Sequence, residues 1–436
     1  MKYYSTKNKK ITANFRTAVI NGIAEDGGLF MPEEIPQFPA GMMQSLPNQS
    51  LHEIGMQVIS KFAGYMDQLS LLKIIEQAIN FNAPVKTLSE SLSILELFHG
   101  PTLAFKDFGA RFLANAMAHF NKDEDKELII LVATSGDTGS AVASSFYGKE
   151  GIKVGLLYPS GMVSQIQEKQ LTTMGKNIKA FEIEGTFDDC QRLVKTAFLD
   201  PNIKEKFNLS SANSINIARL LPQSLYYFYA YGQVKKNLGI DDVIFTVPSG
   251  NFGNLTAGLI AGKMGLPVKK YIAAVNSNTV FTEYLQNGVF KPRPARKTLS
   301  NAMDVGDPSN FVRIEALFDK NINRIRQHIY SDSATDQETI ATIKSIYEQY
   351  KYIIDPHGAV GCFVNEKYRK INPGPAHAVV LETAHPAKFA DCVEPALNMK
   401  IEMPARLAAC LNKQKNALKI SSDFNTFREG LIAEMK

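Results

Sequence analysis

The stretch ELIILVATSGDTGSAVASSFYG, residues 127–148, decides the fold class. Its apolar run at 127–133 is typical of a strand that is buried on both faces. A turn rich in glycine and hydroxyl groups follows at 134–140, and the alanine-rich segment after it predicts a helix. A buried strand, a glycine turn and a helix in this order predict a βαβ unit. We therefore expect a mostly parallel α/β sheet covered by helices.

The same pattern recurs along most of the chain. Further buried strands are predicted at 152–158, 178–184, 241–247, 271–276 and 377–383, with helices between them. This region is long enough for two such sheets, with a break near the apolar helix 216–234 and the polar stretch after it. We expect an N-terminal domain at 1–88, a smaller α/β domain at 89–235 and a larger one at 236–436.

Composition excludes several classes of protein. The chain of 436 residues is 45% hydrophobic and carries a formal charge of only +5, with no long basic run, so nucleic acid is not an expected partner. No signal peptide or membrane-length apolar run is present, which predicts a cytoplasmic protein without a membrane partner. The cysteines lack CxxC spacing and partnering histidines, so we expect neither a metal site nor a disulfide framework; they are Cys190, Cys362, Cys392 and Cys410.

One lysine lies in an unusually apolar setting, within HGPTLAFKDFGARF at 99–112. Apolar residues from Phe108 onward recur at helical spacing, which places Lys106 at the start of a helix beside Phe105. The positive end of a helix and apolar neighbours both disfavour a charged amine, and a neutral amine can form a Schiff base with a carbonyl. The alternative is a lysine whose stem crosses apolar neighbours while its ammonium stays in water.

The loop PSGNFGN at 248–254 connects a predicted strand to a predicted helix. Its glycines allow a tight bend, so that the backbone amides of Gly250, Asn251, Phe252, Gly253 and Asn254 can converge on an anion, best matched to a phosphate. An ordinary strand-to-helix turn remains an alternative. The loop matches neither the P-loop nor the GxGxxG pattern, which disfavours a nucleotide-binding enzyme.

Three further positions could contact a ligand at strand ends or helix starts. The loop 134–140 offers hydroxyl and amide donors to a carboxylate, or alternatively a capped helix start with Asp137 or Thr138 as N-cap. Thr383 ends a strand, where its hydroxyl could bond a ring nitrogen or be merely structural. In NSINIAR at 213–219, Asn213 and Arg219 could face one ligand, and Arg219 could grip a phosphate or form a surface salt bridge.

Taken together, these motifs resemble the threonine synthase family. The likeness spans almost the whole chain and is carried, in order, by AVINGIAEDGGLFMPEEIP (18–36), LFHGPTLAFKDFGARF (97–112), ATSGDTGSA (133–141), NSINIARLL (213–221), VPSGNFGNLTAG (247–258), LSNAMDVGDPSN (299–310) and TAHPAKF (383–389). The resemblance implies a pyridoxal-phosphate enzyme of fold type II, which is tryptophan-synthase-β-like, with two doubly wound, mostly parallel sheets and an N-terminal domain.

The resemblance also implies a role for each matching residue. Lys106, on the smaller domain, would hold pyridoxal 5'-phosphate covalently and then move protons. The larger domain would bind the cofactor phosphate through Gly250, Asn251, Phe252, Gly253 and Asn254. Thr383 would face the pyridine nitrogen and Asp137 the ring hydroxyl, where many relatives have Asn. Ser135 and Thr138 would bind the substrate carboxylate, and Asn213 with Arg219 the leaving phosphate.

The implied reaction converts O-phospho-L-homoserine and water into L-threonine and phosphate, by a lyase that is a monomer or homodimer. It is the last step of threonine biosynthesis. A threonine or serine dehydratase on the same scaffold is the nearest alternative, but it has no leaving phosphate for Arg219 to hold. A non-catalytic relative is expected to have lost the lysine or the phosphate loop, and both are present here.

Overall fold

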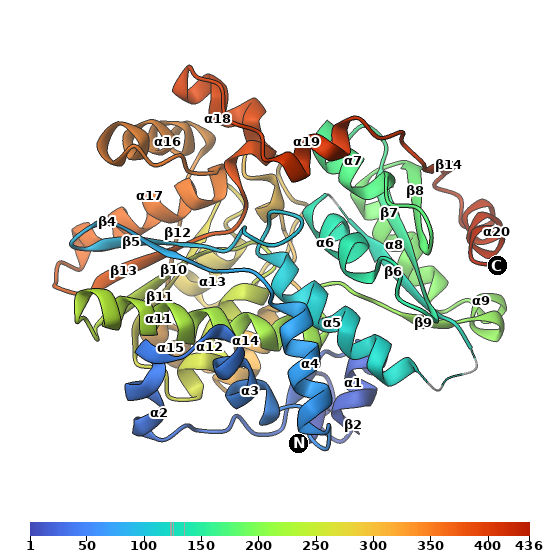
Figure 1. Cartoon of the computed structure of the whole chain (residues 1–436), viewed down its shortest axis with the longest axis horizontal. Helices are drawn as coiled ribbons and strands as arrows, with labels where there is room; N and C mark the ends of the chain where they lie inside the picture. Colours follow the sequence, from blue (N-terminus) through green and yellow to red (C-terminus); the bar gives the residue numbers. More distant parts are fainter. Residues whose placement is uncertain (123, 125, 135) are drawn as a thin grey trace.

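Two β-sheets lie side by side above a mainly helical N-terminal unit in the computed structural model (Figure 1). The structure describes residues 1–122, 124, 126–134 and 136–436. The chain first forms the N-terminal unit and then contributes two strands to the larger sheet. It next forms most of the smaller sheet, returns to complete the larger one, and finally adds one strand to the smaller one.

The N-terminal unit combines a small antiparallel sheet, ordered β2-β1-β3, with short helices. Ser50 begins α3 with a reciprocal capping box with Glu53, which satisfies donors at the helix start. Helix α3 packs against α11, and α4 packs against α5. The elements are β1 (Tyr3–Ser5), β2 (Thr12–Ala13), α1 (Phe15–Asn21), β3 (Phe30–Pro32), α2 (Ala40–Ser45), η1 (Leu46–Asn48), α3 (Leu51–Ser60) and α4 (Gln68–Ala78).

The larger sheet has six strands in the order β12-β11-β10-β13-β5-β4, and only the β4–β5 pair is antiparallel. Alternate residues of β10 serve opposite faces: Phe245 packs in the core shared with α11 and α12, whereas Ile244 packs in the core shared with α17. The strands are β4 (Val85–Ser89), β5 (Leu92–Glu96), β10 (Val243–Pro248), β11 (Val268–Val275), β12 (Ile329–Ser333) and β13 (His377–Glu382).

Helices cover both faces of this sheet, as expected of a buried parallel sheet. Helices α16 and α18 lie outside α17, and α13 and α15 pack against β12. The helical elements are α11 (Leu225–Leu238), α12 (Gly253–Lys263), α13 (Val280–Asn287), η3 (Asn301–Met303), α14 (Phe311–Leu317), α15 (Ile322–His328), α16 (Asp336–Tyr350), α17 (Pro356–Ile371), η4 (Pro386–Phe389) and α18 (Ala390–Leu397).

The smaller sheet has five parallel strands in the order β14-β8-β7-β6-β9. Ile130 of β6 packs in the core shared with α5 and α6, and Ile129 in the core shared with α8 and α20. The strands are β6 (Leu128–Ala133), β7 (Ile152–Pro159), β8 (Ile178–Glu184), β9 (Asn208–Ser210) and β14 (Leu418–Ser421). The helical elements are α5 (Lys106–Asn121), α6 (Asp137–Phe146), α7 (Gln165–Thr172), α8 (Phe187–Ala197), α9 (Pro201–Lys206), α10 (Ile217–Leu220), η2 (Leu221–Ser224), α19 (Ala405–Leu411) and α20 (Phe424–Glu434).

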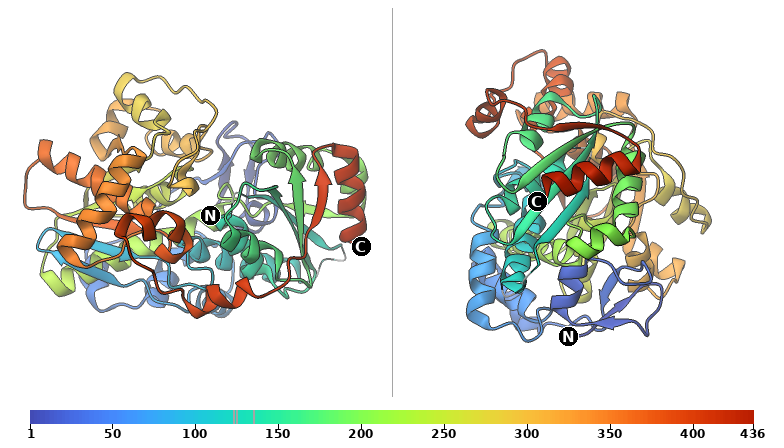
Figure 2. Two further views of the ribbon diagram at one scale, coloured as in Figure 1. Left: turned by 90° about the horizontal axis from the view of Figure 1, so that it is seen from above. Right: turned by 90° about the vertical axis from the view of Figure 1, so that its right-hand side faces the viewer.

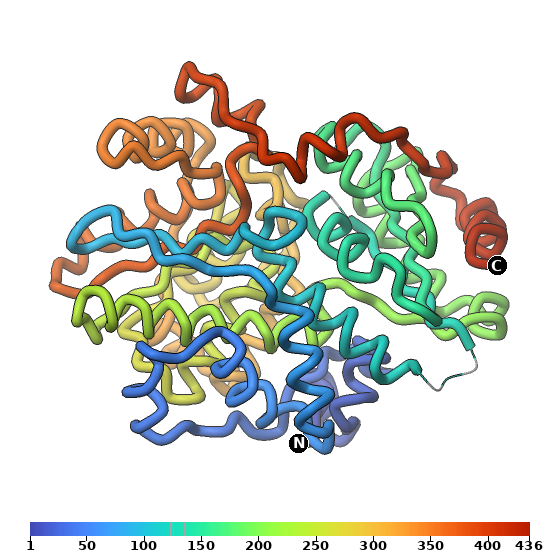
Figure 3. The backbone as a smooth tube through the Cα atoms, in the orientation of Figure 1, coloured from blue at the N-terminus to red at the C-terminus, as the bar shows by residue number. Residues whose placement is uncertain are grey.

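The predicted strands all form, but the sheets do not follow the expected segments 89–235 and 236–436. Strand β5 lies in the first of these segments yet belongs to the six-stranded sheet, and β14 lies in the second yet pairs with β8 of the five-stranded sheet. Figure 2 shows β14 and α20 (dark red) beside the green strands. In Figure 3 the C-terminal tube crosses from one sheet unit to the other. Parallel pairing requires no closeness in sequence, so the order of strands along the chain could not reveal these exchanges.

Candidate active site

Lys106 is the first residue of α5, and the segment before it is fastened to the end of β13. The N–H of Phe105 donates a 2.9 Å hydrogen bond to the carbonyl of Thr383, and His385 N–H donates to the carbonyl of Leu103 at 3.1 Å. Leu103 has φ 58°, a left-handed conformation that a non-glycine residue adopts only at some cost in energy. These contacts bring Thr383 next to the predicted reactive lysine.

The environment of Lys106 favours its neutral form. Its Nζ lies 4.0 Å from Oδ2 of Asp137 and 5.9 Å from the centre of the Phe105 ring. Burial lowers the pKa of Lys106 to about 8; Asp137 opposes this shift, and the cations Lys388 and Arg219 add to it. An amine with this pKa is partly neutral near pH 7, as a nucleophile must be. The prediction that this lysine lies at a helix start is confirmed, but charged side chains as well as Phe105 surround its ammonium.

Asp137 is the first residue of α6, at the carboxyl end of β6, and is 4% exposed. Burial alone would raise the pKa of its carboxyl, but Lys388 and Lys106 together lower it, so the group is a carboxylate. The alternative that Asp137 or Thr138 is the N-cap is wrong, because Gly136 occupies that position with φ 137°. Thr138 is half-buried in the first helical turn. Ser135, predicted to bind the substrate carboxylate, lies outside the described residues.

The loop after β10 has the geometry of an anion cradle. Phe252 precedes α12 in the left-handed conformation, with φ 57°. A Cβ on Gly250 would lie 2.7 Å from the Cα of Met303, so only glycine fits there. In the part of the chain that the structure describes, the backbone amides of residues 250–254 donate to no protein acceptor. Free amides at a helix N-terminus favour an anion such as phosphate.

The two asparagines of this loop use their side chains to shape it. Asn254 donates to the carbonyl of Pro248 at 2.9 Å and accepts from Ser249 Oγ at 2.5 Å. Asn251 donates to Ser214 Oγ at 2.6 Å. Because both side chains bond to other protein groups, the two asparagines would contact an anion through their backbone amides.

Arg219 is buried beside Lys106, so the surface salt bridge considered from sequence is wrong. It is 2% exposed, and a Cβ on Gly109, one turn after Lys106 in α5, would lie 3.1 Å from Arg219 Nε. Burial lowers the pKa of Arg219 to about 10. Its Nη1 donates to the carbonyl of Ala212, but its buried Nε has no partner among the described residues. An unpaired guanidinium nitrogen in a dry setting is a good donor for a phosphate.

Asn213 lies half-buried at the start of the same loop. Its carbonyl accepts a 3.1 Å hydrogen bond from the N–H of Asn216, which closes the turn leading to α10. Because Ser214 contacts Asn251, this loop adjoins the anion cradle as well as Arg219. This loop therefore joins the segment beside the anion cradle to the helix that carries Arg219.

Sequence reasoning missed one cation of the site, Lys388 in η4. Its side chain is fully buried, and its Nζ lies 2.7 Å from Oδ1 of Asp137 and 3.1 Å from the carbonyl of Thr102. Gln167 of α7 donates to the same Oδ1 at 3.2 Å. Lys388 falls within the motif TAHPAKF, but nothing in the sequence indicated that its ammonium reaches a carboxylate on the other sheet unit.

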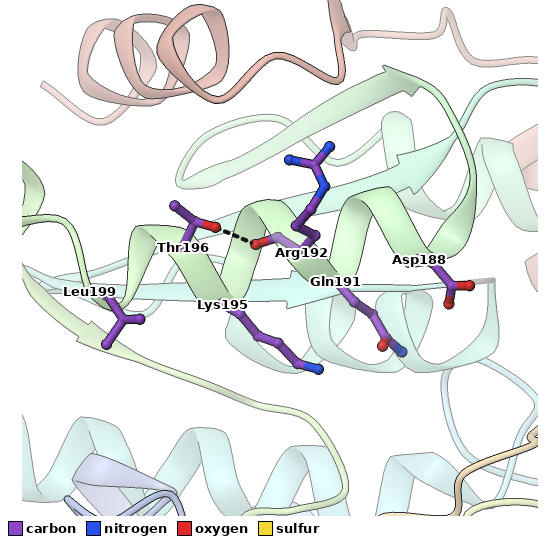
Figure 4. A pocket seen from close by; sticks show the side chains of 6 residues that line it. All are labelled: Asp188, Gln191, Arg192, Lys195, Thr196 and Leu199. Carbon is purple, nitrogen blue, oxygen red and sulfur yellow. Dashed lines mark hydrogen bonds between the residues drawn. The ribbon is translucent and has the colours of Figure 1, made fainter. Parts of the chain in front are cut away.

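Two surface hollows are lined mainly by other residues. One follows α8 and is lined by Asp188, Gln191, Arg192, Lys195, Thr196 and Leu199 (Figure 4). The other lies beside Phe98, Tyr352 and His385. Neither is lined by Lys106, Asp137 or Thr383, so the candidate active site is defined by contacts between elements rather than by either hollow.

Comparison with known families identifies three matching regions. Residues 2–79 match a family described as threonine synthase N terminus, residues 82–382 match pyridoxal-phosphate dependent enzymes, and residues 358–429 match threonine synthase, C-terminal. The threonine synthase of Escherichia coli K12 is 41% identical over 436 residues, covering 98% of this chain and 99% of that protein. The Schizosaccharomyces pombe threonine synthase is 36% identical over 91% of this chain and 89% of its own length.

Solved structures agree with the sequence matches. The Escherichia coli threonine synthase superposes with a TM-score of 0.92 at 40% identity, covering 99% of this chain and 100% of that one. A structure of threonine synthase from Brucella melitensis with pyridoxal phosphate bound also gives 0.92, at 35% identity and with both chains fully covered. More distant neighbours, such as a maize serine racemase at 15% identity, share the fold alone.

The residues present fit pyridoxal 5'-phosphate. Lys106 offers an amine of lowered pKa to an aldehyde, and the amides of residues 250–254 offer unused donors to a phosphate. The predicted fold type II is confirmed by the matches to pyridoxal-phosphate enzymes. With the family matched from residue 2 to 429 and relatives near 40% identity over nearly the full chain, this protein belongs to the threonine synthase family of pyridoxal-phosphate dependent enzymes.

Proposed function

We propose that this chain converts O-phospho-L-homoserine and water into L-threonine and inorganic phosphate. The observation that carries the proposal is the place of Arg219, a buried cation beside Lys106 whose Nε has no partner among the residues that the structure describes. A substrate with its own phosphate needs an anion site besides the one for the cofactor phosphate. The amides of residues 250–254 and the guanidinium of Arg219 supply two such sites.

Lys106 moves the protons in this proposal. Bound pyridoxal phosphate supplies an electron sink that stabilises negative charge at the α-carbon of the substrate. Lys106, once its amine is free, takes the α-proton, and its pKa of about 8 suits it both to accept and to return protons near neutral pH. A second proton leaves the β-carbon, phosphate leaves the γ-carbon, a proton returns to the γ-carbon, and water adds at the β-carbon.

The remaining residues orient the reactants. Thr383 bonds the pyridine nitrogen in this proposal, and its backbone hydrogen bond to the residue before Lys106 supports that role. Asp137 meets the ring hydroxyl in this proposal, and the position of its Oδ2 4.0 Å from Lys106 Nζ supports that role. Ser135 and Thr138 bind the substrate carboxylate, and Asn213 with Arg219 holds the departing phosphate.

The deciding experiment measures three products in one set of tubes. Purified protein with O-phospho-L-homoserine is expected to release phosphate and threonine in equal amounts, and with L-threonine or L-serine to release no ammonia. Ammonia without phosphate would instead assign a dehydratase. Lys106→Ala is expected to lose both turnover and covalently held cofactor, whereas Lys73→Ala, on the exposed face of α4, keeps both.

We also propose that the enzyme works in the cytoplasm as a monomer or a homodimer. Within the described residues, no helix has the length and apolar character that a membrane crossing requires. Light scattering on the purified protein distinguishes the two assembly states, and cell fractionation tests the location.

A further inference from the structure

Lys388 and Asp137 join the two sheet units next to the reactive lysine. Lys388 lies in η4, which follows β13 of the six-stranded sheet, whereas Asp137 begins α6, which follows β6 of the five-stranded sheet. Their ion pair, at 2.7 Å, involves side chains that are 0% and 4% exposed. A buried cation loses its hydration, so it stays buried only where other groups replace the water.

The two oxygens of the Asp137 carboxylate have different partners. Oδ1 accepts from Lys388 Nζ and from Gln167 Nε2, at 2.7 and 3.2 Å. Oδ2 faces Lys106 Nζ at 4.0 Å. With Oδ1 fixed by two donors, the carboxylate cannot rotate freely, and Oδ2 is held 4.0 Å from Lys106 Nζ, beyond the length of a close ion pair.

We propose that Lys388 is a positioning residue that acts on Lys106 through Asp137. Its ammonium fixes Asp137 as an oriented anion and shares the charge of that carboxylate with Lys106. This inference rests on the proposed role of Lys106 and adds a residue to which the sequence assigned no function.

The charged groups around Lys106 determine how its pKa changes when the Lys388 ammonium is removed. Lys106 faces Asp137 from α6, Lys388 from η4 and Arg219 from α10. His357 of α17 also contributes to lowering the pKa of Asp137. Without the Lys388 ammonium, Lys106 loses a repelling cation, and the Asp137 carboxylate becomes free to approach Lys106 more closely. Both effects favour the charged form of Lys106, so its pKa is expected to rise.

The test follows the reaction of Lys106 with pyridoxal 5'-phosphate in the full-length chain freed of cofactor. Only the neutral amine attacks an aldehyde, so the rate of appearance of the visible absorption band rises with pH through the pKa of Lys106. In Lys388→Gln, which keeps a donor but no charge, the midpoint is expected about half a pH unit or more above that of the wild type. An unchanged midpoint would overturn the proposal.

A double-mutant cycle separates action through Asp137 from direct repulsion. In an Asp137→Asn background, Lys388→Gln is expected to shift the midpoint clearly less than in the wild type. Equal shifts in the two backgrounds would refute the route through Asp137. Should Lys388→Gln not fold, Lys388→Met, which keeps a long side chain without its charge, takes its place; a raised midpoint supports the proposal and a wild-type midpoint overturns it. None of these rates involves the amino-acid substrate, so they are independent of the phosphate-release assay.

Discussion

The carbonyl of Thr383 accepts a 2.9 Å hydrogen bond from the N–H of Phe105, so the end of β13 is bonded to the residue that precedes the reactive lysine. This contact joins two positions that are far apart in sequence. It fixes the spacing between the backbones of Thr383 and Lys106, from which their side chains extend. Errors of about 1 Å between catalytic groups can cost large factors in rate, which gives such a backbone link its value.

Thr383→Val tests the hydroxyl itself. Valine keeps the shape but removes the hydrogen-bonding group, so we expect kcat to fall about tenfold or more with little change in folding stability. Steady-state kinetics on O-phospho-L-homoserine and thermal unfolding measure the two effects. Thr342→Val, on α16 with only a local bond to the carbonyl of Glu338, is the matched control. A normal kcat in Thr383→Val would remove Thr383 from the site.

Gly250→Ala tests the anion cradle. The added Cβ would lie 2.7 Å from the Cα and 2.8 Å from the carbonyl oxygen of Met303. Both are backbone atoms, so the backbone of the loop must move to accommodate alanine. We expect affinity for pyridoxal 5'-phosphate to fall about tenfold or more, since each 1.4 kcal/mol is a factor of ten. Titration of the cofactor-free protein measures it. In Gly41→Ala, where a Cβ would meet no described atom within 4 Å, affinity should not change.

Arg219→Met separates the two anion sites. Methionine retains much of the buried volume over Gly109 while removing the charge. A hydrogen bond to a charged group contributes about 1.5–3 kcal/mol, so KM for O-phospho-L-homoserine is expected to rise about 10- to 100-fold while the cofactor absorbance stays. Arg16→Met, which removes an exposed pair with Glu124, is the control. Loss of cofactor with an unchanged KM would instead place Arg219 at the cofactor phosphate.

Lys106→Met is expected to stabilise the cofactor-free protein at pH 7 while abolishing activity. Burial lowers the pKa of Lys106 from 10.5 to about 8, so between these values the unfolded chain binds more protons than the folded one. Wild-type stability therefore rises with pH across this window. Below pH 8, burying the charged amine costs on the order of 3 kcal/mol.

Urea unfolding at several pH values between 7 and 10.5 measures this effect. The advantage of Lys106→Met over the wild type should shrink as the pH rises through the window. Lys73→Met, at an exposed position, should show no such trend. A stability difference that does not change with pH would mean that Lys106 titrates normally.

The sequence predicted those features that depend on local pattern. Strand runs such as the one at 377–382 have a hydrophobic signal of their own, and the helix start at Lys106 follows from the spacing after Phe108. The free amides of residues 250–254 were likewise expected from the two glycines of that loop. Such features need no knowledge of what the chain packs against.

Features that depend on long-range contacts were missed. Lys388 has an unremarkable sequence neighbourhood, and its partnership with Asp137 exists only because β6 and β13 end near each other in space. Arg219 could be read as exposed or buried, because burial depends on Gly109 leaving room for its guanidinium. The choice of sheet for β14 also depends on tertiary packing, since a strand of four residues has too little pattern to specify its neighbour.

The position of β14 also bears on how the protein is made. Strand β8 pairs with β7 on one side, and its other edge is covered by β14, which lies near the C-terminus. During synthesis, at roughly 5–20 residues per second, that edge stays open for tens of seconds after β8 has emerged from the ribosome. An open strand edge invites pairing with other chains. A chain that terminates shortly before residue 418 would therefore retain Lys106 and the anion cradle but expose an aggregation-prone edge.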